Sequence, residues 1–263
     1  MIEARRLTKR YGDLVAVEDV SFSLARGEVV GFLGPNGAGK TTTMRMLTGF
    51  LPATDGTALI AGHDIFADPI AARRAIGYLP ETPPLYPEMT VQSFLAYVAR
   101  IKDVPRASRR TAVDRALERT ALTDVRRQVI GTLSRGYRQR VGLAQAIVHS
   151  PPVLILDEPT AGLDPLQIRE IRALLAELTA ASQGDTQQTV ILSTHILAEV
   201  DAICRRVILI NQGRKVVDAP LSELTSGGRT LDQIFTEHTA RDAVSAAASP
   251  SEATDGSEAG IAP

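Results

Sequence analysis

A glycine-rich stretch near the N-terminus has the residue types that bind phosphate groups. It reads Gly34-Pro35-Asn36-Gly37-Ala38-Gly39-Lys40-Thr41, followed by Thr42. Glycines let the backbone turn with positive φ, so that successive N–H groups point inward at phosphate oxygens. Lys40 would reach the β- and γ-phosphates of a nucleoside triphosphate, and the Thr41 hydroxyl would ligate Mg²⁺. A chance glycine-rich turn is the alternative, but at ordinary residue frequencies such a match is roughly a 1% event per chain.

An acidic pair is the second group that could do chemistry. Asp157 and Glu158 follow the continuous apolar run 152–156. A carboxylate at the carboxyl end of a parallel strand faces the crevice where α/β sheets bind ligands. Asp157 is therefore placed to hold the hydration shell of Mg²⁺, and Glu158 to polarise an attacking water as general base. Two acids that merely cap a strand–loop junction are the alternative, which the phosphate-binding stretch disfavours.

The surrounding sequence predicts the elements that would position these groups. An apolar run such as 152–156 is typical of a strand buried on both faces of a parallel sheet. Turn residues separate further runs of this kind, and helical patterns alternate with them, which predicts an α/β fold. Strands are expected at 2–7, 15–17, 20–24, 28–33, 57–61, 76–79, 152–156, 189–193 and 206–211, and helices at 42–47, 68–74 and 165–181.

The middle of the chain has a different character. Between about residues 88 and 149, strand signals give way to helical patterns at 91–101, 108–121 and 138–148. A helical insert subdomain therefore interrupts a single domain that covers residues 1–238. The segment 239–263 is rich in Ala, Ser, Glu and Gly without periodicity, which is typical of a disordered tail.

Composition narrows the class of protein. The net charge of −1 argues against a general nucleic-acid binder. The single cysteine, Cys204, excludes a disulfide framework and a multi-cysteine zinc site. No apolar run approaches the ~20 residues needed to span a bilayer, and the N-terminus lacks the apolar region of a signal peptide. We therefore expect a cytoplasmic protein whose role at a membrane, if any, comes through a partner.

The segment at the start of the third helix of the insert has a pattern that is specific to one protein family. It reads Leu133-Ser134-Arg135-Gly136-Tyr137. Over about residues 1–238 the chain resembles the ATP-binding cassette subunit of an ABC transporter, whose signature loop is Leu-Ser-Gly-Gly-Gln. Arg135 replaces the first glycine and Tyr137 the glutamine. The resemblance implies that Ser134 and Gly136 act on ATP held by the other subunit of a twofold dimer, although Ser134 would also serve as an ordinary helix N-cap.

Other positions match the family one at a time. Tyr11 resembles the aromatic residue that stacks on adenine, although an isolated tyrosine is more often a core or surface residue. Asp164 ends a segment, 159–164, that resembles the D-loop and would contact the partner subunit. His195 resembles the histidine that contacts the γ-phosphate and, with Lys40, would stabilise charge during hydrolysis. Glu81 stands where the family often has glutamine, and would contact Mg²⁺ or water.

The resemblance also implies a fold and partners. The fold would be a phosphate-loop NTPase core with a mostly parallel sheet, an N-terminal antiparallel β subdomain and the helical insert. ATP and Mg²⁺ would be the cofactors. Integral membrane permease subunits and a second ATP-binding subunit, in a homodimer, would be the partners, with no nucleic acid. The protein would lie on the inner face of the cell membrane.

A narrower resemblance, to exporter-type cassettes of the drug-export and gliding-motility groups, rests on the segments 82–89, 133–140 and 164–168. In the first of these, exposed Leu85, Tyr86 and Met89 would form a docking patch for the membrane subunits; a rigid loop packed on its own domain is the alternative.

Two other functions of the protein stay open. One is a cassette ATPase of DNA or ribosomes, and the other is a regulatory subunit that binds ATP but hydrolyses it weakly.

Overall fold

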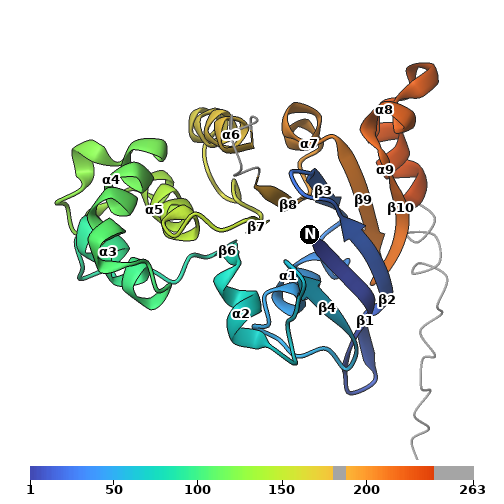
Figure 1. Ribbon diagram of the computed structural model, residues 1–263. Helices are drawn as coiled ribbons and strands as arrows, with labels where there is room; N and C mark the ends of the chain where they lie inside the picture. Colours follow the sequence, from blue (N-terminus) through green and yellow to red (C-terminus); the bar gives the residue numbers. More distant parts are fainter. Residues whose placement is uncertain (180–187, 240–263) are drawn as a thin grey trace, which may run out of the picture.

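A computed structural model of the chain describes residues 1–179 and 188–239. Figure 1 shows two sheets and the helices that cover them on one side of the molecule, and the helices of the insert on the other. The predicted tail at 239–263 lies outside the described residues except for Thr239, which ends the last helix.

The elements follow in this order: β1 (Ile2–Tyr11), β2 (Leu14–Leu24), β3 (Val29–Leu33), α1 (Lys40–Leu47), β4 (Asp55–Ile60), β5 (His63–Asp64), α2 (Pro69–Arg74), β6 (Ile76–Leu79), α3 (Val91–Ile101), α4 (Arg109–Arg119), α5 (Arg135–Ile147), β7 (Val153–Asp157), α6 (Pro165–Thr179), β8 (Thr189–Thr194), α7 (Leu197–Ile203), β9 (Arg206–Asn211), β10 (Arg214–Pro220), α8 (Leu221–Leu224) and α9 (Leu231–Thr239). Short 3₁₀ turns lie at Arg106–Ser108, Thr123–Val125, Ile130–Thr132 and Ser226–Gly228.

The larger sheet has six strands in the order β10-β9-β3-β8-β7-β6, and all neighbouring strands except β10 and β9 pair in parallel. Every residue of β3, β7 and β8 is buried. Alternate side chains of β7 enter different clusters: Val153 and Ile155 pack with α1, and Leu154 and Leu156 pack with the helices of the other face. This two-sided burial explains the continuous apolar runs in the sequence.

The smaller sheet is antiparallel, in the order β2-β1-β4-β5, as the family resemblance implies. It packs on the larger sheet, where the rings of Phe22 and Phe32 lie 5.7 Å apart. One expectation is corrected here, because the predicted strands 15–17 and 20–24 form the single strand β2. The two parts are joined by a β-bulge that contains Asp19, whose φ is +48°. The N–H of Asp19 donates to Thr8 Oγ1 at 3.1 Å.

The insert consists of α3, α4 and α5 packed around a shared apolar core that includes Phe94, Leu117 and Leu143. Side-chain caps fix where two of these helices begin. Thr90 Oγ1 accepts a hydrogen bond from the N–H of Ser93 at the start of α3, and Ser134 does the same for Tyr137 at the start of α5. Helix α5 therefore starts at Arg135, earlier than the predicted 138.

The sequence analysis missed β5, β10, α7, α8 and α9. Strand β10 is an edge strand without a buried residue, so it lacks the alternating pattern of a strand with one buried face. It is held by tertiary pairing with β9 and by the ion pair between Arg206 and Asp218, whose N and O atoms lie 2.6 Å apart.

Candidate functional site

The phosphate-binding stretch forms a turn between β3 and α1, as predicted. Gly39 caps α1 with φ of +100°, and Gly37 has φ of +80°, conformations that glycine adopts without strain. Close packing also requires glycine at two positions. A Cβ at Gly34 would lie 2.4 Å from the carbonyl oxygen of Ile210, and one at Gly39 would lie 2.6 Å from that of Ala16. The loop therefore packs directly against the backbones of β9 and β2, which leaves no space for a side chain at these two positions.

Lys40 is buried at the start of α1 and its ammonium group closes the loop. Nζ donates to the carbonyl oxygens of Gly34 at 2.8 Å and Pro35 at 3.1 Å. It also lies 3.4 Å from Oε1 of Glu158, which comes from the far side of the cleft. The phosphate loop and the second acidic residue thus meet in space.

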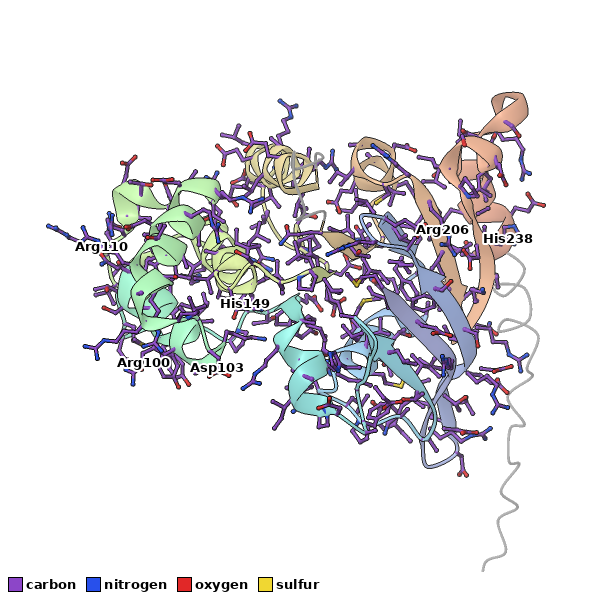
Figure 2. All side chains as sticks on the ribbon, viewed as in Figure 1. Arg100, Asp103, Arg110, His149, Arg206 and His238 are labelled. Carbon is purple, nitrogen blue, oxygen red and sulfur yellow. The ribbon has the colours of Figure 1, made fainter. Side chains whose placement is uncertain are left out.

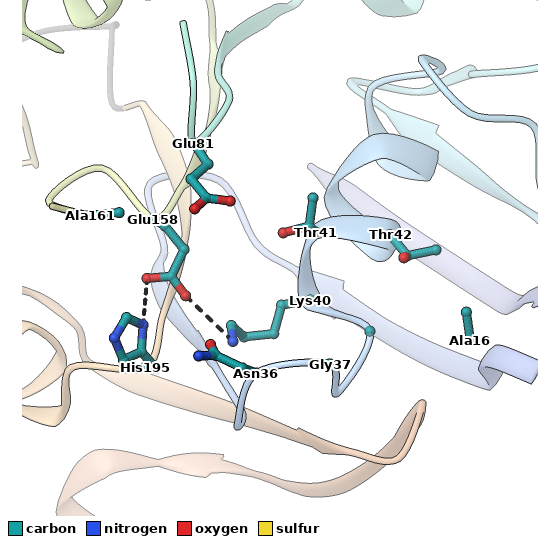
Figure 3. Close-up of a pocket in the computed structure, with 11 residues that line it drawn as sticks. Ala16, Asn36, Gly37, Lys40, Thr41, Thr42, Glu81, Glu158, Ala161 and His195 are labelled. Carbon is teal, nitrogen blue, oxygen red and sulfur yellow. Dashed lines mark hydrogen bonds and ion pairs between the residues drawn. The ribbon is translucent and has the colours of Figure 1, made fainter.

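Glu158 follows directly after β7 and is 6% exposed. Its φ of +48° is uncommon for a residue with a side chain and turns the chain sharply out of the sheet. Its Oε2 lies 2.8 Å from Nδ1 of His195, which follows β8. Figure 3 shows Glu158 between His195 and Lys40, with both contacts dashed. A buried carboxylate with two basic partners is held in one position.

Asp157 is the deeper member of the acidic pair. Its Oδ1 accepts hydrogen bonds from the hydroxyls of Ser193 and Thr41, while its buried Oδ2 has no partner. Burial raises the pKa of the Asp157 carboxyl, while these two hydrogen bonds lower it and the charges of Glu158 and Glu81 raise it further. An orphaned carboxylate oxygen beside a threonine hydroxyl suits a hard cation such as Mg²⁺.

Lys40, Glu158 and His195 surround one cleft of about 410 Å³ beside the phosphate loop, and Asp157 is not among the residues that line it. It is lined by Ala16, Asn36, Gly37, Gly39, Lys40, Thr41, Thr42, Glu81, Glu158, Ala161 and His195 (Figure 3). Most of these positions were predicted from the sequence. Ala16 and Ala161 were not, and neither was Ser193 beneath Asp157. Ser193 is the register partner of Asp157 in β8, so only the pairing of the two strands could reveal it.

Tyr11 lies at the end of β1, outside the residues that line the cleft. Tyr11 is 48% exposed, and the ammonium of Lys9 lies 5.3 Å from the centroid of its ring. Tyr11 is therefore not a core residue.

Three predicted residues lie together but do not line the cleft: Ser134, Gly136 and Asp164. Asp164 Oδ1 accepts from the N–H groups of Leu166 at 3.0 Å and Gln167 at 2.9 Å at the start of α6. A Cβ at Gly136 would lie 2.8 Å from the side chain of Gln167. The start of α5 and the start of α6 therefore form one surface.

The predicted docking patch is corrected by the structure. Leu85 and Met89 are partly buried and pack against the core of the insert, so they are not free apolar surface. Tyr86 alone of the three is exposed. Its ring centroid lies 6.0 Å from that of Phe94 and 5.7 Å from that of Tyr97. The structure thus contradicts the expected exposure of Leu85 and Met89, and docking of membrane subunits on this segment stays a prediction.

The fold and the cleft define a nucleoside triphosphate-binding protein of the phosphate-loop class. Residues 17–161 match the protein-family model described as ABC transporter. The chain is 41% identical over 217 residues to the uncharacterized ABC transporter ATP-binding protein YhcH of Bacillus subtilis (strain 168), covering 82% of this chain and 68% of that protein. It is 36% identical over 229 residues to the bacitracin transport ATP-binding protein BcrA of Bacillus licheniformis, covering 87% and 72%.

A solved structure of the ATP-binding subunit of an ABC transporter superposes with a TM-score of 0.79 at 31% identity, covering 90% of this chain and 98% of that one. The chain belongs to the ABC transporter family. Its predicted fold class and its resemblance to ATP-hydrolysing, exporter-type cassettes are confirmed. Among the described residues, no helix is both long and apolar enough to cross a bilayer.

Proposed function

We propose that this chain binds Mg²⁺-ATP in the cleft beside Lys40 and hydrolyses it to drive transport, in the direction of export, through separate membrane subunits. One observation carries the proposal: the phosphate loop, the buried Glu158 carboxylate and His195 converge on a single cleft. Each group comes from a different part of the chain. Their convergence suits phosphoryl transfer, which depends mainly on positioning and electrostatic stabilisation.

In this proposal the phosphates lie on the N–H groups of residues 34–39 and at the start of α1, together with Thr42. Lys40 exchanges its contacts with two carbonyl oxygens and Glu158 for phosphate oxygens. That exchange releases Glu158, which then accepts a proton from the attacking water. His195 holds the Glu158 carboxylate in place and contacts the γ-phosphate. Tyr11 stacks on the adenine.

Asp157 and Thr41 would hold Mg²⁺, and Glu81 lines the same cleft. The unpartnered Oδ2 of Asp157 supports this assignment. Mg²⁺ is usually held by one or two carboxylates plus the phosphates of the substrate, and residues 1–179 and 188–239 contain no cluster of three or more His, Cys, Asp or Glu that could hold a metal without them. When bound, Mg²⁺ would neutralise charge on the transferring phosphoryl group.

Ser134, Gly136 and Asp164 would complete the cleft of a second copy in a twofold dimer. None of the three lines the cleft of its own chain, and in a twofold pair each copy would present them to the other. Closure would need ATP at the junction, and hydrolysis would loosen it. The chain would act on the inner face of the cell membrane, where this movement would drive the membrane subunits. The relationship to the bacitracin transport protein supports that role.

A mixing experiment tests the shared site. Lys40→Ala disables the phosphate loop of its own chain, and Ser134→Ala disables the surface given to the partner. Each variant alone should have background ATPase activity. A mixed dimer would contain one intact cleft, so an equal mixture should recover about a quarter of the wild-type sites by random pairing. Activity of the mixture that does not exceed the sum of the two variants would overturn the shared site.

A further inference from the structure

Arg135 connects two segments that are far apart in the sequence. Its Nη2 donates to the carbonyl oxygen of Ala161 at 3.0 Å. Ala161 lies in the loop 160–164, between Glu158 and the start of α6. Arg135 itself is the first residue of α5, next to Ser134. The guanidinium therefore bridges the two segments that are proposed to face the partner subunit.

Arg135 also packs against the backbone of Gly162, in addition to its hydrogen bond with Ala161. A Cβ built on Gly162 would lie 2.2 Å from Nη2 and 2.3 Å from Cζ of Arg135. Any other residue would displace the guanidinium, which lies directly against the glycine backbone. The φ of Gly162, +67°, also favours glycine. The loop is thus shaped to receive this side chain.

Two further contacts join the same two segments. Gln139 Nε2 donates to the carbonyl oxygen of Pro159 at 2.8 Å, and Gly136 packs against Gln167. Gln139 is buried, whereas Arg135 is exposed. Pro159 and Gln167 lie on either side of the loop 160–164, and Arg135 contacts its middle. Without the arginine, the middle of the loop would lose its contact with α5.

We propose that Arg135 is a positioning residue for ATP hydrolysis: it fixes the loop 160–164 against Ser134 of the same chain, so that both segments meet the partner's nucleotide as one ordered surface. This inference rests on the proposed shared site. Ordering a surface before association lowers the entropy lost when the dimer closes. Arg135 stands where the family motif has a glycine, which cannot make this contact.

Substitution of Arg135 tests the inference through dimer closure. In a Glu158→Gln background, which stops turnover, ATP-dependent dimerisation is measured by sedimentation over a range of protein concentrations. Arg135→Ala should weaken it by about tenfold, or about 1.4 kcal/mol, because the loop 160–164 would then have to be ordered when the dimer closes. Arg135→Lys keeps a donor for Ala161 and should recover part of the loss. The melting temperature and the ATP affinity of the separate chain should change far less than dimerisation does.

Arg140→Ala is the matched control. Arg140 lies on the same helix and pairs with Glu170 of α6, but does not contact the loop 160–164. It should leave dimerisation within about twofold of the parent, since its partner Glu170 lies outside the loop 160–164. If Arg135→Ala behaves like this control, the positioning role is wrong. If the parent itself fails to dimerise with ATP, the shared site on which the inference rests is wrong.

A double-mutant cycle with Gly162→Ala adds a readout that a general loss of stability would not reproduce. The added methyl group displaces the Arg135 guanidinium, so Gly162→Ala should weaken dimerisation more in the Arg135 background than in the Arg135→Ala background. Additive effects of the two substitutions would contradict the contact as the cause.

Discussion

Nδ1 of His195 and Oε2 of Glu158 lie 2.8 Å apart, although 37 residues separate them in the sequence. The carboxylate accepts from Nδ1, and Nε2 would donate to a phosphate oxygen in the imidazolium form, in which both ring nitrogens carry a proton. The two residues follow neighbouring parallel strands, β7 and β8, whose carboxyl ends meet at one edge of the sheet. The pair orients both a base and a phosphate contact toward the cleft.

Replacing Glu158 with glutamine should remove turnover but keep nucleotide binding. The amide keeps the size of the side chain but cannot take a proton from water, and general-base catalysis contributes typically ~10²–10⁴-fold. ATPase rate and nucleotide affinity measured on the same sample check this. Glu118→Gln, on the exposed face of α4, is the control. A Glu158→Gln variant that retains near wild-type hydrolysis would remove Glu158 from its proposed role.

Replacing Asp157 with asparagine should stabilise the nucleotide-free protein. Burial raises the pKa of this carboxyl, so folding becomes less favourable as pH rises from its ordinary value of 3.8 through the folded pKa. Asparagine removes that cost, and its advantage in melting temperature at pH 7 should shrink below pH 3.8. Asp13→Asn, on the exposed turn after β1, should show no such gain.

With Mg²⁺ and ATP bound, wild type should become more stable than the Asp157→Asn variant. A ligand that binds only the folded state raises the melting temperature by mass action. Wild type should gain more from Mg²⁺-ATP than Asp157→Asn does, if Asp157 helps to hold the cation. Equal gains in the two proteins would contradict the assignment of Asp157 to the metal.

Two glycines of the phosphate loop should differ in what an added methyl group costs. Gly37→Ala adds strain from a φ of +80° but meets open space, which costs about 1–2 kcal/mol. Gly39→Ala adds both strain and a contact of 2.6 Å with the Ala16 carbonyl oxygen, and should cost about 3 kcal/mol or more. Urea unfolding without nucleotide measures the difference. Equal costs would show that the loop shifts freely away from β2.

His149 should make the protein sensitive to acid. It lies two residues after the end of α5 (Figure 2), and its Nε2 lies 3.1 Å from the Ile76 carbonyl oxygen of β6. Burial, helped by the charge of Lys102, lowers its pKa from 6.5 to about 4. The unfolded chain therefore takes up a proton first as pH falls.

Stability should consequently decrease as pH falls from 6.5 to about 4, by up to roughly 3 kcal/mol for the full shift. His149→Gln keeps a donor for Ile76 but does not titrate, so its loss over this range should be smaller. His63→Gln, at an exposed site, should follow the wild-type curve. Unfolding free energies measured at several pH values distinguish these outcomes.

The sequence by itself determined the features that depend on contiguous residues. The phosphate loop, the acidic pair and the helical insert are written in local patterns of glycine, charge and apolar spacing, and the structure shows the loop, the pair and the insert where these patterns lie. The mostly buried strands β6 and β9 were predicted at their exact bounds, since burial selects mostly apolar residues.

Only the tertiary structure decided which distant side chains meet. The contact of Lys40 with Glu158, the hydroxyl of Ser193 on Asp157 and the guanidinium of Arg135 on Gly162 all depend on strand register or on packing between separate segments. Edge strand β10 likewise exists through its pairing with β9. Local sequence patterns carry no record of such partners, because the physical cause lies in another part of the chain.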